Sequence, residues 1–215
     1  MMSIEVKICG LDRVESVDAA IENGADLVGF VFYPPSPRNL TPEVAAALIA
    51  RVPNNVTRVG LFVDPTDEVI DAALVGTKLD LLQLHGSETP DRVTEIKQRT
   101  QLPVMKVIKL ASEADLLIAT DYYDVADRLL FDAKPPADME NALPGGNALA
   151  FDWKLLANAD IPLSWMLAGG LNAANISEAI QTSGTTAVDV SSGVEEAPGV
   201  KNPSRIKEFL LAAKS

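Results

Sequence analysis

The feature of this sequence that most constrains its fold is a regular alternation of short apolar segments with longer amphipathic ones. We predict strands at Val6–Leu11, Leu27–Phe32, Arg58–Val63, Leu79–Leu84, Val104–Ile108, Arg128–Phe131, Leu163–Ala168 and Ala187–Val190. The stretches between them have helical character, and we predict helices at Val14–Asn23, Pro42–Arg51, Asp67–Val75, Asp91–Arg99, Glu113–Tyr123, Trp153–Asn158, Ala174–Ser183 and Pro203–Ala213. Thr41, Thr66 and Asn202 are suitable N-cap residues for three of these helices.

Strict strand–helix alternation indicates parallel strands joined by right-handed crossovers, and continuous apolar strands fit a sheet covered on both faces. Both a closed (β/α)8 barrel and an open doubly wound sheet meet these conditions. Eight repeats favour the barrel, and no G-x-G-x-x-G follows the first strand, as many nucleotide-binding open sheets would require. We therefore predict an α/β fold, a parallel eight-stranded TIM barrel that forms a single domain over residues 1–215.

Composition excludes several classes of function. The formal net charge is −12, whereas a nucleic-acid binder needs a positive stripe for the phosphate backbone. No window approaches the ~18 apolar residues of a membrane span, and Glu5 and Lys7 interrupt any N-terminal signal peptide. One histidine and one cysteine are too few soft ligands for a zinc site. We expect a cytoplasmic protein without a metal, a nucleic-acid partner or a membrane partner, and a monomer, since a barrel of this length can stand alone.

In such barrels the reactive groups gather at the carboxyl ends of the strands. The first predicted strand ends at Cys9, on the same side as Lys7, and a nearby ammonium favours the thiolate, lowering the pKa of the thiol. Cys9 is thus a candidate base or nucleophile, or else a small buried apolar residue.

Asp132 follows three bulky apolar residues at the end of the sixth strand. Apolar surroundings favour a protonated carboxyl, so Asp132 is a candidate general acid, although a helix cap or a salt-bridge partner would look the same.

Glycine and serine cluster after the last two strands. Gly169 and Gly170 follow the seventh strand, while Ser191, Ser192 and Gly193 follow the eighth. Paired glycines let backbone N–H groups turn toward an anion, and serine hydroxyls add donors. These two loops are where many barrels hold a phosphate, so we predict a phosphorylated small-molecule substrate.

Three further features are candidates for substrate contact. Arg38 lies in a proline-rich loop after the second strand, where a fixed guanidinium suits a planar carboxylate, although a surface arginine is the alternative. Gln83 and His85 share the inward side at the end of the fourth strand and could position substrate or serve structure alone. The long connection Ala133–Ala150 is either a cover for the site or a solvated insertion.

Ordered motifs from Lys7 to Glu195 resemble the phosphoribosylanthranilate isomerases of tryptophan biosynthesis. They are K-I-C-G-L, G-A-D-L-V-G-F-V-F-Y-P-P-S-P-R-N, R-V-G-L-F-V-D, L-Q-L-H-G, L-L-F-D-A, P-G-G-N…F-D-W, L-A-G-G-L-N-x-x-N and V-D-V-S-S-G-V-E. The sequence departs from many members after Gly145 and Gly146, where Asn147 precedes Ala148 rather than a third glycine.

The resemblance implies an Amadori rearrangement of N-(5-phosphoribosyl)anthranilate to 1-(2-carboxyphenylamino)-1-deoxyribulose 5-phosphate, without metal or organic cofactor. It further implies that Asp132 protonates the ribose ring oxygen and that Cys9 takes the proton from C2′. Arg38 would hold the anthranilate carboxylate, and Asp189 would contact the anthranilate amine. Gly170 and Ser192, with their loop neighbours, would hold the phosphate.

Two other functions are compatible with the pattern. A phosphosugar aldolase or epimerase could use the same barrel, with Lys7 or Lys106 as a desolvated Schiff-base lysine. A non-catalytic binder of phosphoribosyl ligands, or a regulatory subunit, would bind without turnover. The Cys9 and Arg38 pattern disfavours the aldolase, and a cysteine and an acid together at strand ends disfavour the binder.

Overall fold

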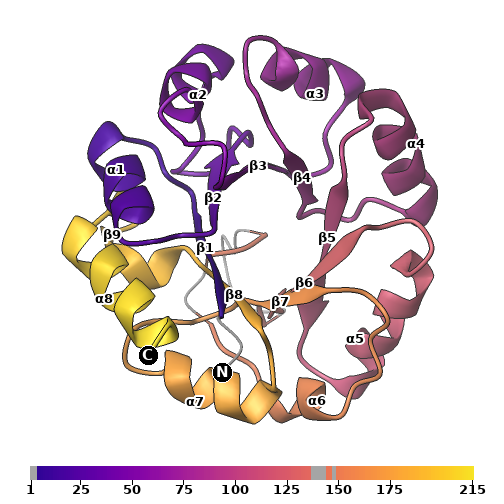
Figure 1. The fold of residues 1–215 in the computed structure, drawn as a ribbon. Helices are drawn as coiled ribbons and strands as arrows, with labels where there is room; N and C mark the ends of the chain where they lie inside the picture. The colour runs from indigo at the N-terminus through magenta and orange to yellow at the C-terminus, as the bar shows by residue number, and fades with distance from the viewer. Residues whose placement is uncertain (1–3, 137–143, 147–148) are drawn as a thin grey trace.

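The computed structural model describes residues 4–136, 144–146 and 149–215 of the chain. Eight parallel strands close into a barrel in chain order, and the helices form a ring around it (Figure 1). The strands are β1 Glu5–Cys9, β2 Leu27–Val31, β3 Thr57–Phe62, β4 Leu81–Leu84, β5 Val104–Leu110, β6 Arg128–Ala133, β7 Trp165–Leu167 and β8 Ala187–Val190. The main helices are α1 Val14–Glu22, α2 Pro42–Ile49, α3 Asp67–Leu74, α4 Pro90–Thr100, α5 Glu113–Ile118, α6 Lys154–Ala157, α7 Ile176–Ser183 and α8 Pro203–Ala213.

The predicted TIM barrel is confirmed, and the predicted elements differ from the observed ones mainly at their ends. The helical stretch predicted from Glu113 continues beyond α5 as a 3-10 helix, Ala119–Tyr122. The side chains of Thr41 and Asn202 cap α2 and α8 as predicted. Thr66 occupies the N-cap position of α3, but its side chain makes no cap hydrogen bond. The predicted cover Ala133–Ala150 is described only in part, and Asn147 and Ala148 lie outside the described residues.

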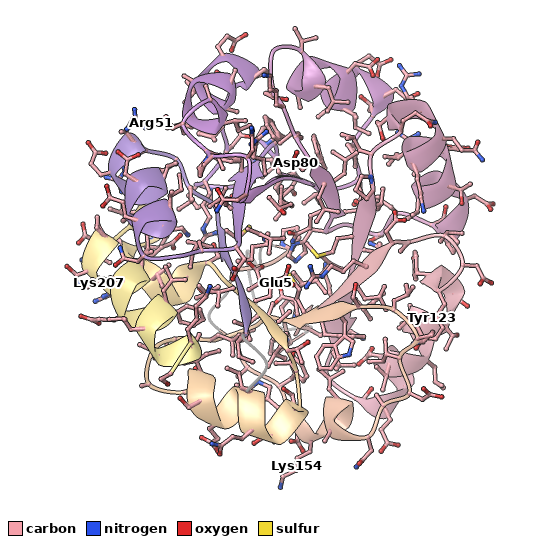
Figure 2. All side chains as sticks on the ribbon, viewed as in Figure 1. Glu5, Arg51, Asp80, Tyr123, Lys154 and Lys207 are labelled. Atoms are coloured by element: carbon pink, nitrogen blue, oxygen red, sulfur yellow. The ribbon has the colours of Figure 1, made fainter. Side chains whose placement is uncertain are left out.

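The core has two layers because successive strand residues face opposite sides of the sheet. One apolar cluster fills the inside of the barrel, and it comprises Leu27, Val59, Leu81, Met105, Val107, Leu130, Met166, Ala168 and Ala187. A larger cluster joins the outer side of the strands to the helices and includes Val28, Phe30, Leu82 and Leu84. Charged side chains such as Arg51, Lys154 and Lys207 lie on the outer side of the helix ring (Figure 2). Inward positions at the strand ends above the inner cluster are therefore where polar side chains can form a site.

A small hairpin follows the barrel and was not predicted. After β8 the chain forms a short 3-10 helix, Ser192–Val194, and then two antiparallel strands, β9 Glu195–Ala197 and β10 Val200–Lys201. Two- and three-residue strands are too short to show a periodic pattern. Among the helices of the described residues, none has the length and apolar character needed to cross a membrane.

Candidate active site

A pocket of about 790 Å³, open to solvent, lies at the carboxyl ends of the strands. It brings together most of the predicted site residues, namely Cys9, Arg38, Gln83, His85, Asp132, Gly169, Gly170, Asp189, Ser191 and Ser192. Of the predicted set, only Gly193 is absent from the lining that the described residues provide. Because these residues come from loops and strands spread over the whole chain, the closed barrel is what assembles the site.

Cys9 lies at the end of β1, is 3% exposed, and faces the pocket. Burial raises the pKa of its thiol, and the nearby Lys7 ammonium offsets this only in part. The prediction that Lys7 lowers the pKa of Cys9 is therefore wrong in its net direction. Desolvation is the larger effect, and the Asp189 carboxylate also opposes the influence of Lys7.

Lys7 and Asp189 form a buried ion pair beside Cys9. They sit opposite each other on β1 and β8, and Nζ of Lys7 donates to Oδ1 of Asp189 at 2.9 Å. Burial tends to lower the pKa of Lys7, but Asp189 and Cys9 outweigh it, so the pKa is raised. Lys7 thus remains a charged group that holds Asp189 in place.

The neighbouring strand provides space for the sulfur of Cys9. Gly29 is the partner of Cys9 in the β1–β2 register. A Cβ at Gly29 would lie 2.8 Å from Sγ of Cys9 and 3.3 Å from Cε of Lys7. A side chain there would therefore displace the thiol from its present position.

Asp132, His85 and Gln83 form a line of hydrogen-bonded side chains. Oδ2 of Asp132 lies 3.1 Å from Nε2 of His85, and Nδ1 of His85 lies 3.1 Å from Nε2 of Gln83. The other carboxylate oxygen of Asp132 accepts from the backbone N–H of Ala133 at 2.9 Å. All three side chains are buried at the pocket wall, so this line fixes how the Asp132 carboxyl faces the pocket.

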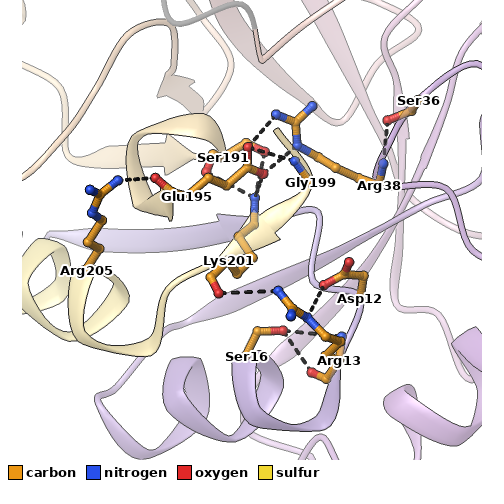
Figure 3. A network of polar contacts seen from close by, with 10 residues as sticks. All are labelled: Asp12, Arg13, Ser16, Ser36, Arg38, Ser191, Glu195, Gly199, Lys201 and Arg205. Carbon is orange, nitrogen blue, oxygen red and sulfur yellow. Dashed lines mark hydrogen bonds and ion pairs between the residues drawn. The ribbon is translucent and has the colours of Figure 1, made fainter. Parts of the chain in front are cut away.

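Arg38 is 5% exposed and belongs to a buried ionic network (Figure 3). Its Nε and Nη2 donate to the two carboxylate oxygens of Glu195 at 2.7 and 2.8 Å. Nζ of Lys201 donates to the same carboxylate at 2.5 Å and to Oγ of Ser191 at 3.0 Å. The surface alternative for Arg38 is therefore wrong. One edge of the guanidinium is occupied by Glu195, and Nη1 faces Gly146, where a Cβ would lie 2.8 Å away.

The charges in this network determine one another. Burial tends to raise the pKa of Glu195, but the hydrogen bonds from Arg38 and the charge of Lys201 outweigh it, and the pKa is lowered. Burial lowers the pKa of Lys201 against the opposing effect of Glu195. An ionised Glu195 is thus what allows two cationic side chains to stay buried together.

The two predicted phosphate loops contact each other directly. Gly169 and Gly170 both adopt positive φ, 88° and 64°, where a glycine is favoured. A Cβ at Gly193 would lie 1.8 Å from the carbonyl oxygen of Leu171 in the preceding loop. Gly193 therefore serves close packing between the loops, while Gly169, Gly170, Ser191 and Ser192 line the pocket.

Neither lysine considered for a Schiff base is suited to that role. Lys7 is ion-paired and carries a raised pKa, whereas a nucleophilic amine must be neutral. Burial lowers the pKa of Lys106, but its Nζ binds Glu88 at 2.7 Å and the carbonyl oxygen of Gly86 at 2.8 Å. Neither lysine is among the pocket-lining residues that the structure describes. The aldolase alternative loses its chemical basis.

Two residues of the site, Glu195 and Lys201, were not predicted. Glu195 ends the motif V-D-V-S-S-G-V-E, yet nothing in its sequence neighbourhood indicates its partner Arg38. Lys201 lies two residues after Pro198 and Gly199, a pair that is typical of a turn. This pair is the signal in the sequence from which a hairpin, and the return of a side chain to the site, could have been predicted.

Comparisons with known proteins agree with this geometry. The chain matches the family model described as N-(5'-phosphoribosyl)anthranilate (PRA) isomerase over residues 6–212. The N-(5'-phosphoribosyl)anthranilate isomerase of Paramagnetospirillum magneticum is 56% identical over 213 residues, covering 99% of this chain and 98% of that protein. The enzyme of the same name from Paracoccus denitrificans is 55% identical over 212 residues, with 99% and 98% coverage.

Solved structures give the same result. Phosphoribosyl anthranilate isomerase from Thermotoga maritima superposes with a TM-score of 0.86 at 38% identity, covering 98% of both chains. A phosphoribosyl anthranilate isomerase in complex with reduced 1-(o-carboxyphenylamino)-1-deoxyribulose 5-phosphate has a TM-score of 0.84 at 36% identity, again covering 98% of both chains. Because the family match spans nearly the whole chain and relatives share more than half of its residues, the chain belongs to the N-(5'-phosphoribosyl)anthranilate isomerase family.

Proposed function

We propose that Asp132 is the general acid and Cys9 the general base of this chain, which is an aldose–ketose isomerase of tryptophan biosynthesis. The observation that carries these roles is that both side chains, buried on β6 and β1, line one pocket. Acid and base can thus act on one bound sugar from different strands of the barrel.

The acid step opens the ribose ring. Asp132 gives its proton to the ring oxygen, the bond between that oxygen and C1′ breaks, and the nitrogen lone pair forms the C=N bond of a protonated Schiff base, whose nitrogen keeps its hydrogen and carries the positive charge. The resulting Asp132 carboxylate is stabilised by the backbone N–H of Ala133 and by His85. Asp132 is therefore both the group that protonates the leaving ring oxygen and the site of the new negative charge that these hydrogen bonds stabilise.

The base step moves the double bond. Cys9, as the thiolate, takes the proton from C2′, and the electron pair of that C–H bond forms an enolamine as the C=N bond electrons return to nitrogen. The enolamine then gains a proton at C1′ and loses one from the C2′ hydroxyl, which gives the ketone. Because burial raises the pKa of Cys9, the thiolate is the minor form at neutral pH, and Lys7 and Lys201 are the cations that favour it.

Substrate orientation follows from the fixed charges. The guanidinium edge of Arg38 that Glu195 leaves open, at Nη1, would hold the anthranilate carboxylate. Oδ2 of Asp189 has no hydrogen-bond partner among the described residues and would contact the anthranilate amine. The loops with Gly169, Gly170, Ser191 and Ser192 would hold the phosphate at the other end of the substrate.

The proposal is tested by the fluorescence of freshly prepared phosphoribosylanthranilate, whose anthranilate-type emission is lost on reaction. We expect the unchanged protein to turn over this substrate in the presence of a chelator. In Asp132→Asn and in Cys9→Ser we expect turnover to fall by about 100-fold or more. Circular dichroism should show that both variants are folded. A folded Cys9→Ser protein with nearly full activity would remove Cys9 from the role of base.

A cytoplasmic location and a monomeric state also belong to this proposal, and sedimentation velocity tests the monomeric state.

A further inference from the structure

We propose that Gln83 is a positioning residue that selects the tautomer of His85 and, through it, the hydrogen bond that stabilises Asp132. Gln83 lies on β4, and His85 directly follows the end of that strand; both side chains line the pocket. Gln83 is fully buried and His85 is 6% exposed, so water does not compete freely for these contacts. The effect on catalysis rests on the role proposed above for Asp132, whereas the tautomer itself does not.

The tautomer follows from what each atom can do. The amide nitrogen of Gln83, 3.1 Å from Nδ1 of His85, can only donate, so Nδ1 must accept. A neutral imidazole whose Nδ1 accepts carries its proton on Nε2. Nε2 lies 3.1 Å from Oδ2 of Asp132 and therefore donates to the carboxylate.

This hydrogen bond favours the form of Asp132 that remains after it has protonated the substrate. A donor aimed at Oδ2 stabilises the carboxylate more than the neutral acid. If the amide of Gln83 were reversed, Oε1 would accept from a proton on Nδ1, and Nε2 would present a lone pair to Asp132 instead of a proton. The orientation of one amide thus decides whether His85 assists the departure of the proton from Asp132 or opposes it.

The other end of the amide does not contribute to this selection. Oε1 of Gln83 is buried and has no hydrogen-bond partner among the described residues. A buried acceptor without a partner costs about 1–3 kcal/mol. Gln83 borders the pocket, but Oε1 itself is shielded, so among the described residues the contact with Nδ1 of His85 alone orients this amide.

The experiment uses the fact that His85 is the only histidine of the chain. Nitrogen-15 NMR of histidine-labelled protein at neutral pH reports directly which ring nitrogen carries a proton. We expect a protonated Nε2 and an unprotonated Nδ1 in the unchanged protein. In Gln83→Glu the side chain can only accept, so we expect Nδ1 to become protonated. Gln83→Met removes the donor while keeping the side-chain length, and we expect it to leave a mixture of the two tautomers.

Gln98→Glu makes the same chemical change at an exposed position of α4 and should leave the ring and the rate unchanged. We expect kcat of Gln83→Glu to fall by about tenfold or more, and KM to change by a smaller factor, because the variant is impaired in proton transfer from Asp132 rather than in substrate binding. A proton on Nδ1 in the unchanged protein, or the same ring protonation in all three proteins, would overturn the inference. The ring measurement stays decisive if the roles proposed for Asp132 and Cys9 fail, since it needs no turnover.

Discussion

Arg38 and Glu195 are 157 positions apart in the sequence, yet Nε and Nη2 of Arg38 both donate to the Glu195 carboxylate, at 2.7 and 2.8 Å. Glu195→Gln keeps the shape of this contact but leaves Arg38 and Lys201 buried without a counter-charge. Removing one partner of a buried ion pair typically costs about 3–5 kcal/mol, so we expect a loss of that order in the free energy of unfolding. We also expect a higher KM for substrate, because the guanidinium is no longer held. Urea denaturation and steady-state kinetics check both effects.

Glu196→Gln is the matched control for this change. Glu196 is the next residue of β9, is exposed, and accepts from Nδ2 of Asn202 at 3.2 Å. Its replacement should change the free energy of unfolding by no more than about 0.5 kcal/mol, as at most surface positions. Equal effects of the two variants would show that the Arg38 network makes no special contribution.

Much of the fold was predictable because it depends on local patterns. Apolar runs of strand length and amphipathic stretches recur eight times, and parallel order follows from their alternation. Cys9 and Asp132 were predictable as pocket residues for the same reason, since both stand at carboxyl ends of strands. The β9–β10 hairpin was not predictable in this way, because its strands of three and two residues show no period.

The charges of the site depend on partners that lie far away in the sequence. Lys7 stands next to Cys9 in the sequence pattern, and its effect on the thiol was anticipated. The opposing Asp189 carboxylate comes from β8, and burial of the thiol depends on the whole barrel. The predicted proximity of Lys7 and Cys9 is therefore observed, whereas the predicted net direction of the Cys9 pKa shift is wrong.

Two glycines should separate catalysis from phosphate binding. A Cβ at Gly29 would lie 2.8 Å from Sγ of Cys9, so Gly29→Ala should displace the thiol and lower kcat. A Cβ at Gly193 would lie 1.8 Å from the carbonyl oxygen of Leu171, so Gly193→Ala should part the two loops proposed to hold the phosphate and mainly raise KM. Each variant is the control for the other, and inhibition by inorganic phosphate should weaken in Gly193→Ala alone. Parallel losses of kcat in both would contradict this division.

Burial of Cys9 predicts how activity responds to pH. Since its pKa is raised, kcat/KM should still be rising with pH above neutrality, as the thiolate forms. The chain has one cysteine and three tyrosines, so the difference in ultraviolet absorbance between the unchanged protein and Cys9→Ser titrates the thiol separately from the phenols. We expect the titration and the basic rise of kcat/KM to report the same pKa. A thiol that ionises below its ordinary value would contradict the role of burial.

The same shift affects folding stability at high pH. Below the ordinary pKa of 9.0 the thiol is protonated in both the folded and the unfolded chain. Above it, the unfolded chain loses the proton while the folded protein keeps it, so the folded state binds more protons and stability falls as pH rises through the folded pKa. In Cys9→Ala this part of the decline should disappear, as measured by urea denaturation at a series of alkaline pH values.

Lys106 should control the position of His85 although it lies outside the pocket lining. Gly86 and Leu84 are the two residues that flank His85. Nζ of Lys106 donates to their carbonyl oxygens at 2.8 and 3.4 Å, respectively. It also pairs with Glu88 at 2.7 Å, and both of these side chains are buried. Lys106→Met should therefore lower the free energy of unfolding by about 3–5 kcal/mol, because the Glu88 carboxylate is left unpaired.

The decisive measurement for Lys106 is the NMR signal of the single histidine, which should shift in Lys106→Met and stay unchanged in Lys207→Met, an exposed position on α8. Adding Glu88→Gln to Lys106→Met removes the uncompensated charge and should recover part of the lost stability. It should not restore the histidine signal, because the carbonyl oxygens of Leu84 and Gly86 still lack their donor. Recovery of the signal together with the stability would mean that the ion pair matters to His85 only through the stability of the whole barrel.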